Sequence, residues 1–223
     1  MRAAAILLAA GRGDRMGGER PKAFLHLGGT SLLERAVATV EACPDIDGFL
    51  VAAPPGHEAR MELKARSDKL LAVVTGGDTR QDSVLAALEG VPEGFDVVLC
   101  HDVARPLAPP KLFSDVLGPL EWADGAVPVV WVSDTVKRVE AGSITETVPR
   151  EVLALAQTPQ AFRRVALWAA HAEARGIGYL ATDDSALLER AGYRVEPVPG
   201  DPANIKVTTP EDLRLAEALL GHG

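Results

Sequence analysis

Six apolar runs are spaced along the chain, and they predict the strands of a sheet. The runs lie at 3–10, 48–53, 70–75, 96–102, 125–132 and 193–199. The first, third and fourth show little alternation of apolar and polar residues, which is typical of strands buried on both faces of a parallel sheet.

Helical patterns separate these runs, and several have recognisable capping residues. Ser31 opens a capping box ahead of an amphipathic stretch. The helical segment 78–90 ends at Gly90, a residue favoured just after a helix. Thr209 followed by Pro210 is a typical helix start. Strands that alternate with helices predict an α/β fold with a doubly wound, mostly parallel sheet.

The segment 133–158 departs from this alternation. It consists of two short stretches of alternating polarity around Ala141 and Gly142, which predicts a β-hairpin because Gly142 favours the turn. Its faces are too polar to form a core, and an isolated two-stranded hairpin is marginally stable in water. We therefore expect an arm that packs on a second subunit or on its own domain, within a single domain spanning 1–223.

Composition narrows the class of protein. A chain of 223 residues, 47% of them hydrophobic, is large enough for one well-filled core. A net charge of −8 argues against a general nucleic-acid binder. The apolar start is short for a signal peptide and no run suits a membrane helix, so we expect a cytoplasmic protein that binds no membrane. Cys43 and Cys100 indicate neither a disulfide framework nor a zinc site.

A glycine-rich, basic loop follows the first predicted strand. The stretch "LLAAGRGDRMGGERPKAF" sets Arg12, Arg15, Arg20 and Lys22 among four glycines. Ligands of open α/β sheets bind at the carboxyl ends of the strands, and glycines let backbone N–H groups approach a phosphate. The loop lacks the GxxxxGK[ST] motif, and Met16 replaces the third glycine of a dinucleotide fingerprint. Its cations suit a triphosphate, although a solvated turn could have the same composition.

Three further stretches, "GGDTRQDSV", "HDVARP" and "ANIKVTTPEDL", place polar residues near the ends of predicted strands. The candidates among them are Asp78, Ser83, Asp102, Arg105 and Lys206. Each stretch also has a structural interpretation: a capped helix start, a structural Asp–Arg pair and a solvated lysine. His101 is accompanied by no serine nucleophile motif, so it does not indicate nucleophilic catalysis.

Together these motifs resemble the 2-C-methyl-D-erythritol 4-phosphate cytidylyltransferase family of the non-mevalonate isoprenoid pathway. The resemblance also includes "SDTVKRV", "TPQAF" and "TDDSALLERAG", and it covers essentially the whole chain in the family's order. It implies a Rossmann-like nucleotidyltransferase fold, with a mostly parallel doubly wound sheet and a protruding β-hairpin arm that interlocks two subunits as a homodimer. It also implies an enzyme that transfers CMP from CTP to 2-C-methyl-D-erythritol 4-phosphate, with Mg²⁺ held mainly by the CTP phosphates.

The same resemblance implies roles for individual residues. Four cations are expected to be catalytic, on the triphosphate and on the acceptor phosphate: Arg15, Lys22, Arg150 and Lys206. The CTP side is expected to comprise Ala9, Ala10, Gly11, Gly13, Gly77, Asp78 and Ser83. The acceptor side is expected to include Asp102, Arg105, Thr135 and Thr158. In the family, the arm positions Thr135 and Arg150 can serve the neighbouring subunit. Since Mg²⁺ is expected to be held largely by phosphate oxygens, Asp102 is its expected protein neighbour.

The chemistry that follows needs no general base, because the acceptor phosphate is mostly dianionic at neutral pH. We expect in-line attack on the α-phosphate, with cations offsetting the repulsion between the two anions. Leu8, Val103 and Ala154 depart from the family's usual residues, but none removes a charged group. Three alternatives remain at this point: an enzyme for another polyol phosphate such as ribitol 5-phosphate, an NAD-dependent dehydrogenase and a non-catalytic nucleotide sensor.

Overall fold

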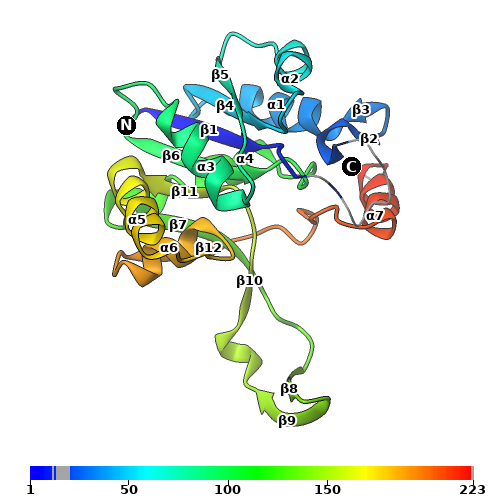
Figure 1. Cartoon of the computed structure of the whole chain (residues 1–223). Coiled ribbons are helices and arrows are strands. Elements are labelled where there is room, and N and C mark those ends of the chain that lie inside the picture. The colour runs from blue at the N-terminus through cyan, green and yellow to red at the C-terminus, as the bar shows by residue number, and fades with distance from the viewer. Residues whose placement is uncertain (12, 14–20, 222–223) are drawn as a thin grey trace.

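The computed structural model describes residues 1–11, 13 and 21–221, and these include a central sheet of eight strands (Figure 1). Its path runs β10-β7-β11-β6-β1-β4-β5, and β12 pairs with β7. The strands are β1 Ala3–Leu8, β4 Gly48–Ala53, β5 Leu70–Thr75, β6 Val97–Asp102, β7 Gly125–Trp131, β10 Ala154–Ala156, β11 Gln160–Arg163 and β12 Val195–Pro199. The pairs β1–β4, β1–β6, β4–β5 and β7–β12 are parallel, whereas β10 and β11 run antiparallel to their neighbours.

Helices cover both faces of the sheet, as the doubly wound prediction requires. The helices are α1 Leu32–Ala42, α2 Glu58–Lys64, α3 Arg80–Glu89, α4 Pro110–Asp115, α5 Arg164–Ile177, α6 Asp184–Arg190 and α7 Pro210–Leu220. Alternate residues of β1 divide between two cores: Leu7 packs with α1 and α4, and Ile6 packs with α3 and α5. This division is what the period of two along a strand demands when both faces are covered.

All six predicted strands form, but one of them is not buried as expected. The run 70–75 becomes β5, which ends the sheet and has only β4 as a neighbour. Leu71 and Thr75 on β5 are exposed, because an edge strand lacks cover on one side. In contrast, β4, in the second run, is buried along its whole length, as is β6 in the fourth.

The helix boundaries agree with the capping residues in the sequence. Ser31 and Thr209 both form complete capping boxes, with Glu34 and Asp212 as the reciprocal partners. Gly90 does follow α3, but its φ of −84° is right-handed, so this helix ends without a left-handed glycine turn.

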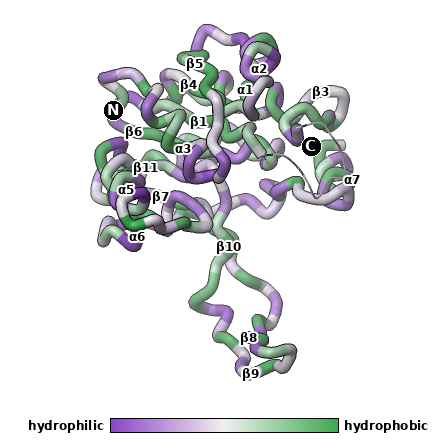
Figure 2. The backbone as a smooth tube through the Cα atoms, viewed as in Figure 1, coloured by the Kyte–Doolittle hydropathy of each residue, from purple (hydrophilic) through white to green (hydrophobic). Residues whose placement is uncertain are grey.

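The predicted hairpin forms an arm that extends away from the sheet (Figure 1). Its strands are β8 Val136–Glu140 and β9 Ser143–Val148, joined at Ala141 and Gly142, whose φ angles of 49° and 82° match a tight hairpin turn. The arm does not lie on its own domain, which removes one of the two expected packings. Hydrophobic and hydrophilic residues are mixed along both of its strands (Figure 2).

The arm is shorter than the predicted range 133–158, because the chain returns to the main sheet before Thr158. Ala154–Ala156 pairs antiparallel with β7 as β10, and Thr158 is buried beside β6. Residues 154–158 therefore belong to the body of the molecule.

Among the described residues, no helix has the length and apolar character needed to span a bilayer.

Candidate active site

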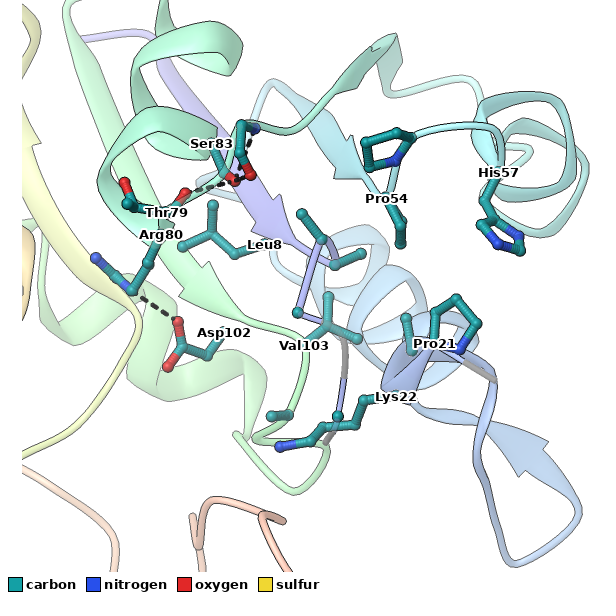
Figure 3. A pocket seen from close by; sticks show the side chains of 18 of the residues that line it. Leu8, Pro21, Lys22, Pro54, His57, Thr79, Arg80, Ser83, Asp102 and Val103 are labelled. Atoms are coloured by element: carbon teal, nitrogen blue, oxygen red, sulfur yellow. Dashed lines mark hydrogen bonds and ion pairs between the residues drawn. The ribbon is translucent and has the colours of Figure 1, made fainter. Parts of the chain in front are cut away.

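A cavity of about 900 Å³ opens where the carboxyl ends of β1, β4 and β6 meet (Figure 3). Parallel strands deliver their carboxyl ends to one edge, so the residues that follow them converge there. Seven residues predicted for the site line this cavity from the strand ends and the start of α3: Ala9, Ala10, Gly11, Gly13, Gly77, Asp78 and Ser83. Lys22, Asp102 and Lys206 line the same cavity. These ten predicted residues therefore lie around one cavity, and their roles in binding stay predictions.

Glycines allow the walls of the cavity to approach one another. Gly13 has a φ of 76°, and a Cβ there would lie 3.2 Å from Cβ of Lys22. A Cβ on Gly76 would lie 2.5 Å from Cβ of Ala10. Any larger residue at Gly76 would therefore push the turn before α3 away from the end of β1. The tight turn also depends on Ser83, whose hydroxyl accepts a hydrogen bond from the N–H of Gly77 at 3.2 Å.

The two described lysines of the site come from opposite ends of the chain and meet at one side of the cavity. Nζ of Lys22 donates to the carbonyl oxygen of Val207 at 2.7 Å, which places it beside Lys206. Nζ of Lys206 lies 2.5 Å from Oδ2 of Asp102. The third predicted cation of this group, Arg15, lies outside the described residues. Lys22 and Lys206 therefore share a cavity, as a site for two phosphates requires.

Asp102 ends β6 and is held between two cations. Its Oδ1 lies 3.1 Å from Nε of Arg80, and its Oδ2 pairs with Lys206. Burial alone would raise the pKa of this carboxyl, but the charges of Arg80 and Lys206 outweigh burial and hold the pKa well below its usual range. Asp102 is therefore ionised at neutral pH.

Arg80 is the residue of this cluster that the site prediction missed, although it stands within "GGDTRQDSV". It is the first residue of α3 and lines the cavity. A cation at a helix N-terminus opposes the helix dipole, so an arginine there indicates a specific carboxylate partner. That signal was available in the sequence. The partner itself was not, because Asp102 and Asp184 reach Arg80 only through the fold.

Four other predicted residues, all of them described, lie outside the cavity lining. Arg105 links two segments of the chain, because it donates hydrogen bonds to the carbonyl oxygens of Asn204 at 2.7 Å and Ala156 at 3.2 Å. Thr158 accepts a hydrogen bond from the backbone N–H of Asp102 at 3.0 Å. Thr135 and Arg150 belong to the arm and are exposed, and Arg150 donates to the carbonyl oxygen of Ser133. These two residues lie apart from their own chain's cavity because the arm leads away from it.

Residues for a divalent cation are few. No group of three or more His, Cys, Asp or Glu side chains that could hold a metal occurs among the described residues. The cavity does offer two carboxylates, Asp78 and Asp102. This donor set fits a magnesium ion held mainly by substrate phosphates. Mg²⁺ typically binds one or two protein carboxylates, and its remaining ligands are phosphate oxygens and water. It does not fit a metal cage built by the protein alone.

The arrangement suits the binding of phosphate esters more than nucleophilic catalysis. Lys22, Lys206 and Arg80 supply positive charge around a cavity whose glycine-rich walls expose backbone. His101 is buried, and its Nδ1 lies 3.2 Å from the hydroxyl of Thr158 rather than facing the cavity. Burial lowers the pKa of His101 to about 4, so the ring is neutral near pH 7.

Comparison with known proteins gives a consistent result over the full chain. The family model described as "IspD: 2-C-methyl-D-erythritol 4-phosphate cytidylyltransferase" matches residues 3–222. The chain is 45% identical to the 2-C-methyl-D-erythritol 4-phosphate cytidylyltransferase of Deinococcus radiodurans, over 99% of this chain and 90% of that protein. It is 42% identical to the protein of the same name from Geotalea uraniireducens, over 99% and 97% of the two chains.

Solved structures lead to the same family. The crystal structure of 2-C-methyl-D-erythritol 4-phosphate cytidylyltransferase from Thermus thermophilus has a TM-score of 0.81 at 39% identity, covering 98% of each chain. The crystal structure of 4-diphosphocytidyl-2C-methyl-D-erythritol synthase from Anaerococcus prevotii has a TM-score of 0.89 at 28% identity, covering 99% of this chain and 96% of that one. The expected Rossmann-like nucleotidyltransferase fold is confirmed.

Proposed function

Because the chain belongs to the 2-C-methyl-D-erythritol 4-phosphate cytidylyltransferase family, we propose that it transfers CMP from CTP to the phosphate of 2-C-methyl-D-erythritol 4-phosphate and releases pyrophosphate. Membership of this family makes the chain a nucleotidyltransferase, which leaves the dehydrogenase interpretation without support. The observation that carries the proposal is the meeting of Lys22, Asp102 and Lys206 in one cavity at the carboxyl edge of the sheet.

The proposed reaction is a direct displacement at the α-phosphorus of CTP. An oxygen of the acceptor phosphate forms a bond to that phosphorus, and the bond from phosphorus to the oxygen that bridges to the β-phosphate breaks. Pyrophosphate leaves with the electron pair. The acceptor phosphate already carries nearly two negative charges, so no side chain has to remove a proton.

The main barrier is the repulsion between two anions, and the lysines are placed to lower it. Lys206 can exchange Asp102 for an oxygen of the acceptor phosphate, because Arg80 remains to keep Asp102 paired. Lys22, held beside Lys206 through Val207, would neutralise charge that develops on the triphosphate. Arg15 is proposed to act with Lys22 on the same phosphates.

The CTP half of the site would lie along the glycine-rich wall. Ala9, Ala10, Gly11 and Gly13 would face the phosphates, with Gly77, Asp78 and Ser83 around the cytosine and ribose. Mg²⁺ would be held by phosphate oxygens of CTP with Asp102 as its protein neighbour, and it would add positive charge where the triphosphate is most negative.

The arm would complete the acceptor side of a second subunit in a homodimer. Thr135 and Arg150 are exposed, and neither lines its own chain's cavity. Val139 and Ile144 at its tip are 60% and 66% exposed, which supports burial against another chain. Arg105 and Thr158 would support this side of the site from within the same chain.

A pyrophosphate-release screen tests the proposal. The four ribonucleoside triphosphates are each paired with 2-C-methyl-D-erythritol 4-phosphate, ribitol 5-phosphate and other sugar phosphates, with Mg²⁺ present. We expect release only with CTP, and fastest with the methylerythritol acceptor. Ribitol 5-phosphate is included because it is a polyol phosphate of similar size, and faster release with it would favour this alternative substrate. No release with any pair would favour a nucleotide sensor.

A further inference from the structure

A continuous line of polar contacts joins the cavity to helix α5 on one face of the sheet. It starts at Lys206 and Asp102 and passes through Arg80, whose Nη1 lies 2.7 Å from Oδ2 of Asp184 at the start of α6. The other oxygen of Asp184, Oδ1, lies 3.0 Å from Nε2 of His171 on α5. The last two members of this line, Asp184 and His171, are described residues that do not line the cavity.

Burial makes these outer contacts specific. The side chains of Asp184 and His171 are only 1% and 0% exposed. A carboxylate can only accept a hydrogen bond, so Nε2 of His171 must carry the proton that it shares with Asp184. Nδ1 of His171 has no hydrogen-bond partner among the described residues, so its contact with Asp184 is the one hydrogen bond that these residues give the ring. Burial would raise the pKa of Asp184, but Arg80 and the hydrogen bond from His171 hold it below its usual value.

Apart from His171, the line pairs two cations, Lys206 and Arg80, with two carboxylates, Asp102 and Asp184. Arg80 stands at the N-terminus of α3, where the helix dipole disfavours a cation, so its place depends on Asp102 and Asp184. Removing the charge of Asp184 would leave Arg80 with one carboxylate partner among the described residues, Asp102, which lines the cavity. The side chain of Arg80 could then change its orientation, and it would no longer fix the position of Asp102.

We infer that Asp184 and His171 are positioning residues for the transfer reaction: they hold Arg80 in the orientation that fixes Asp102 and thereby sets Lys206 for the acceptor phosphate. This inference rests on the proposed function, and it adds two residues that touch neither substrate. A buried ion pair can also be purely structural, so the test must separate positioning from stability.

The test compares Asp184→Asn, His171→Leu and His171→Gln with wild type. Asp184→Asn places an amide N–H₂ against Arg80 or His171, both of which are donors, and His171→Leu removes the donor to Asp184. The glutamine amide in His171→Gln can still donate to Asp184, so this variant serves as the conservative rescue. The matched control is Leu167→Ala, which removes a fully buried apolar side chain one helical turn before His171 on α5 and leaves every polar group of the line in place.

For Asp184→Asn and His171→Leu we expect kcat/KM for the acceptor to fall by about 10-fold or more. Residues that orient metal ligands through hydrogen bonds have effects of this size when they are replaced. The KM for CTP should stay close to the wild-type value. His171→Gln should restore most of the lost activity. Leu167→Ala should lower the unfolding temperature, and the KM for the acceptor should not change. An equal loss of kcat/KM for the acceptor in Leu167→Ala would overturn the inference. So would a value for His171→Gln as low as that for His171→Leu.

A crystal structure of Asp184→Asn supplies a readout that does not depend on turnover. We expect the 3.1 Å contact between Arg80 and Asp102 to be lost or rearranged in that variant. An unchanged contact would refute the positioning role even if wild type proved inactive on the proposed acceptor. Inactive wild type with a disrupted contact would instead refute the proposed substrate and leave the positioning role standing.

Discussion

Replacing Lys206 with methionine removes a charge from the cavity while keeping a side chain of similar length. The side chain of Lys206 is 41% exposed, and its ammonium pairs with Asp102 at 2.5 Å. Water screens such a partly exposed pair, so its loss should cost about 1 kcal/mol of stability or less. Asp102 also keeps Arg80 as a partner and is not left as a lone buried charge. We therefore expect Lys206→Met to fold normally.

The effect of Lys206→Met on catalysis should be far larger than its effect on stability. A cation placed on a transition-state charge is worth about 3–4 kcal/mol, so kcat/KM for the acceptor should fall by about 10²–10³-fold. The assay is steady-state pyrophosphate release at varied acceptor concentration, together with thermal unfolding of each variant. Lys111 provides a matched control, because it also pairs with an aspartate, Asp115, at 2.5 Å but is 80% exposed and does not line the cavity.

Lys111→Met should leave kcat and both KM values unchanged, since its ion pair lies on the surface. Loss of activity in both lysine variants would mean that the effect is not specific to the cavity. Near wild-type turnover in Lys206→Met would refute the argument that this lysine stabilises the phosphates.

Further predictions concern Lys22, Arg150 and His101. Lys22→Ala should lower kcat by about 10²–10³-fold with folding intact, and steady-state kinetics showing normal turnover would exclude it from the transition state. Arg150→Ala should mainly raise the KM for the acceptor, and an unchanged KM would contradict the role given to the arm. The pKa of His101 falls from 6.5 in the unfolded chain to about 4 in the folded one, because burial lowers it more than the charge of Asp102 raises it. The unfolded chain therefore binds more protons below pH 6.5, and the free energy of unfolding should fall by about 3 kcal/mol between pH 6.5 and 4. Urea unfolding across this range should show a smaller pH dependence in His101→Asn, and an equal dependence would contradict the assignment.

The body of the fold could be predicted from the sequence because its elements depend on local patterns. The run 48–53 and the helix that Ser31 caps formed where the pattern placed them. The burial of β5 could not be predicted, because an edge strand and a central strand can have equally apolar sequences. β10 and β11 were also missed, since three or four residues carry too little periodicity to indicate a strand.

The candidate site could be predicted in part for a related reason. Lys22 and Asp102 stand in motifs at strand ends, and the rule that strand ends meet brought them together. The bond from Lys22 to the carbonyl oxygen of Val207 depends on a backbone atom and leaves no mark in the sequence. The partnership of Arg80 with Asp184 joins residues 104 positions apart, which only the packed fold reveals.

The most direct test of the central claim is a crystal structure of the chain with CTP, Mg²⁺ and the acceptor or a non-reactive analogue of either substrate. The account predicts that the α-phosphate of CTP and the acceptor phosphate lie side by side in the cavity, with Lys22 and Lys206 in contact with them. A triphosphate bound away from these lysines, or an acceptor phosphate bound outside their reach, would contradict it.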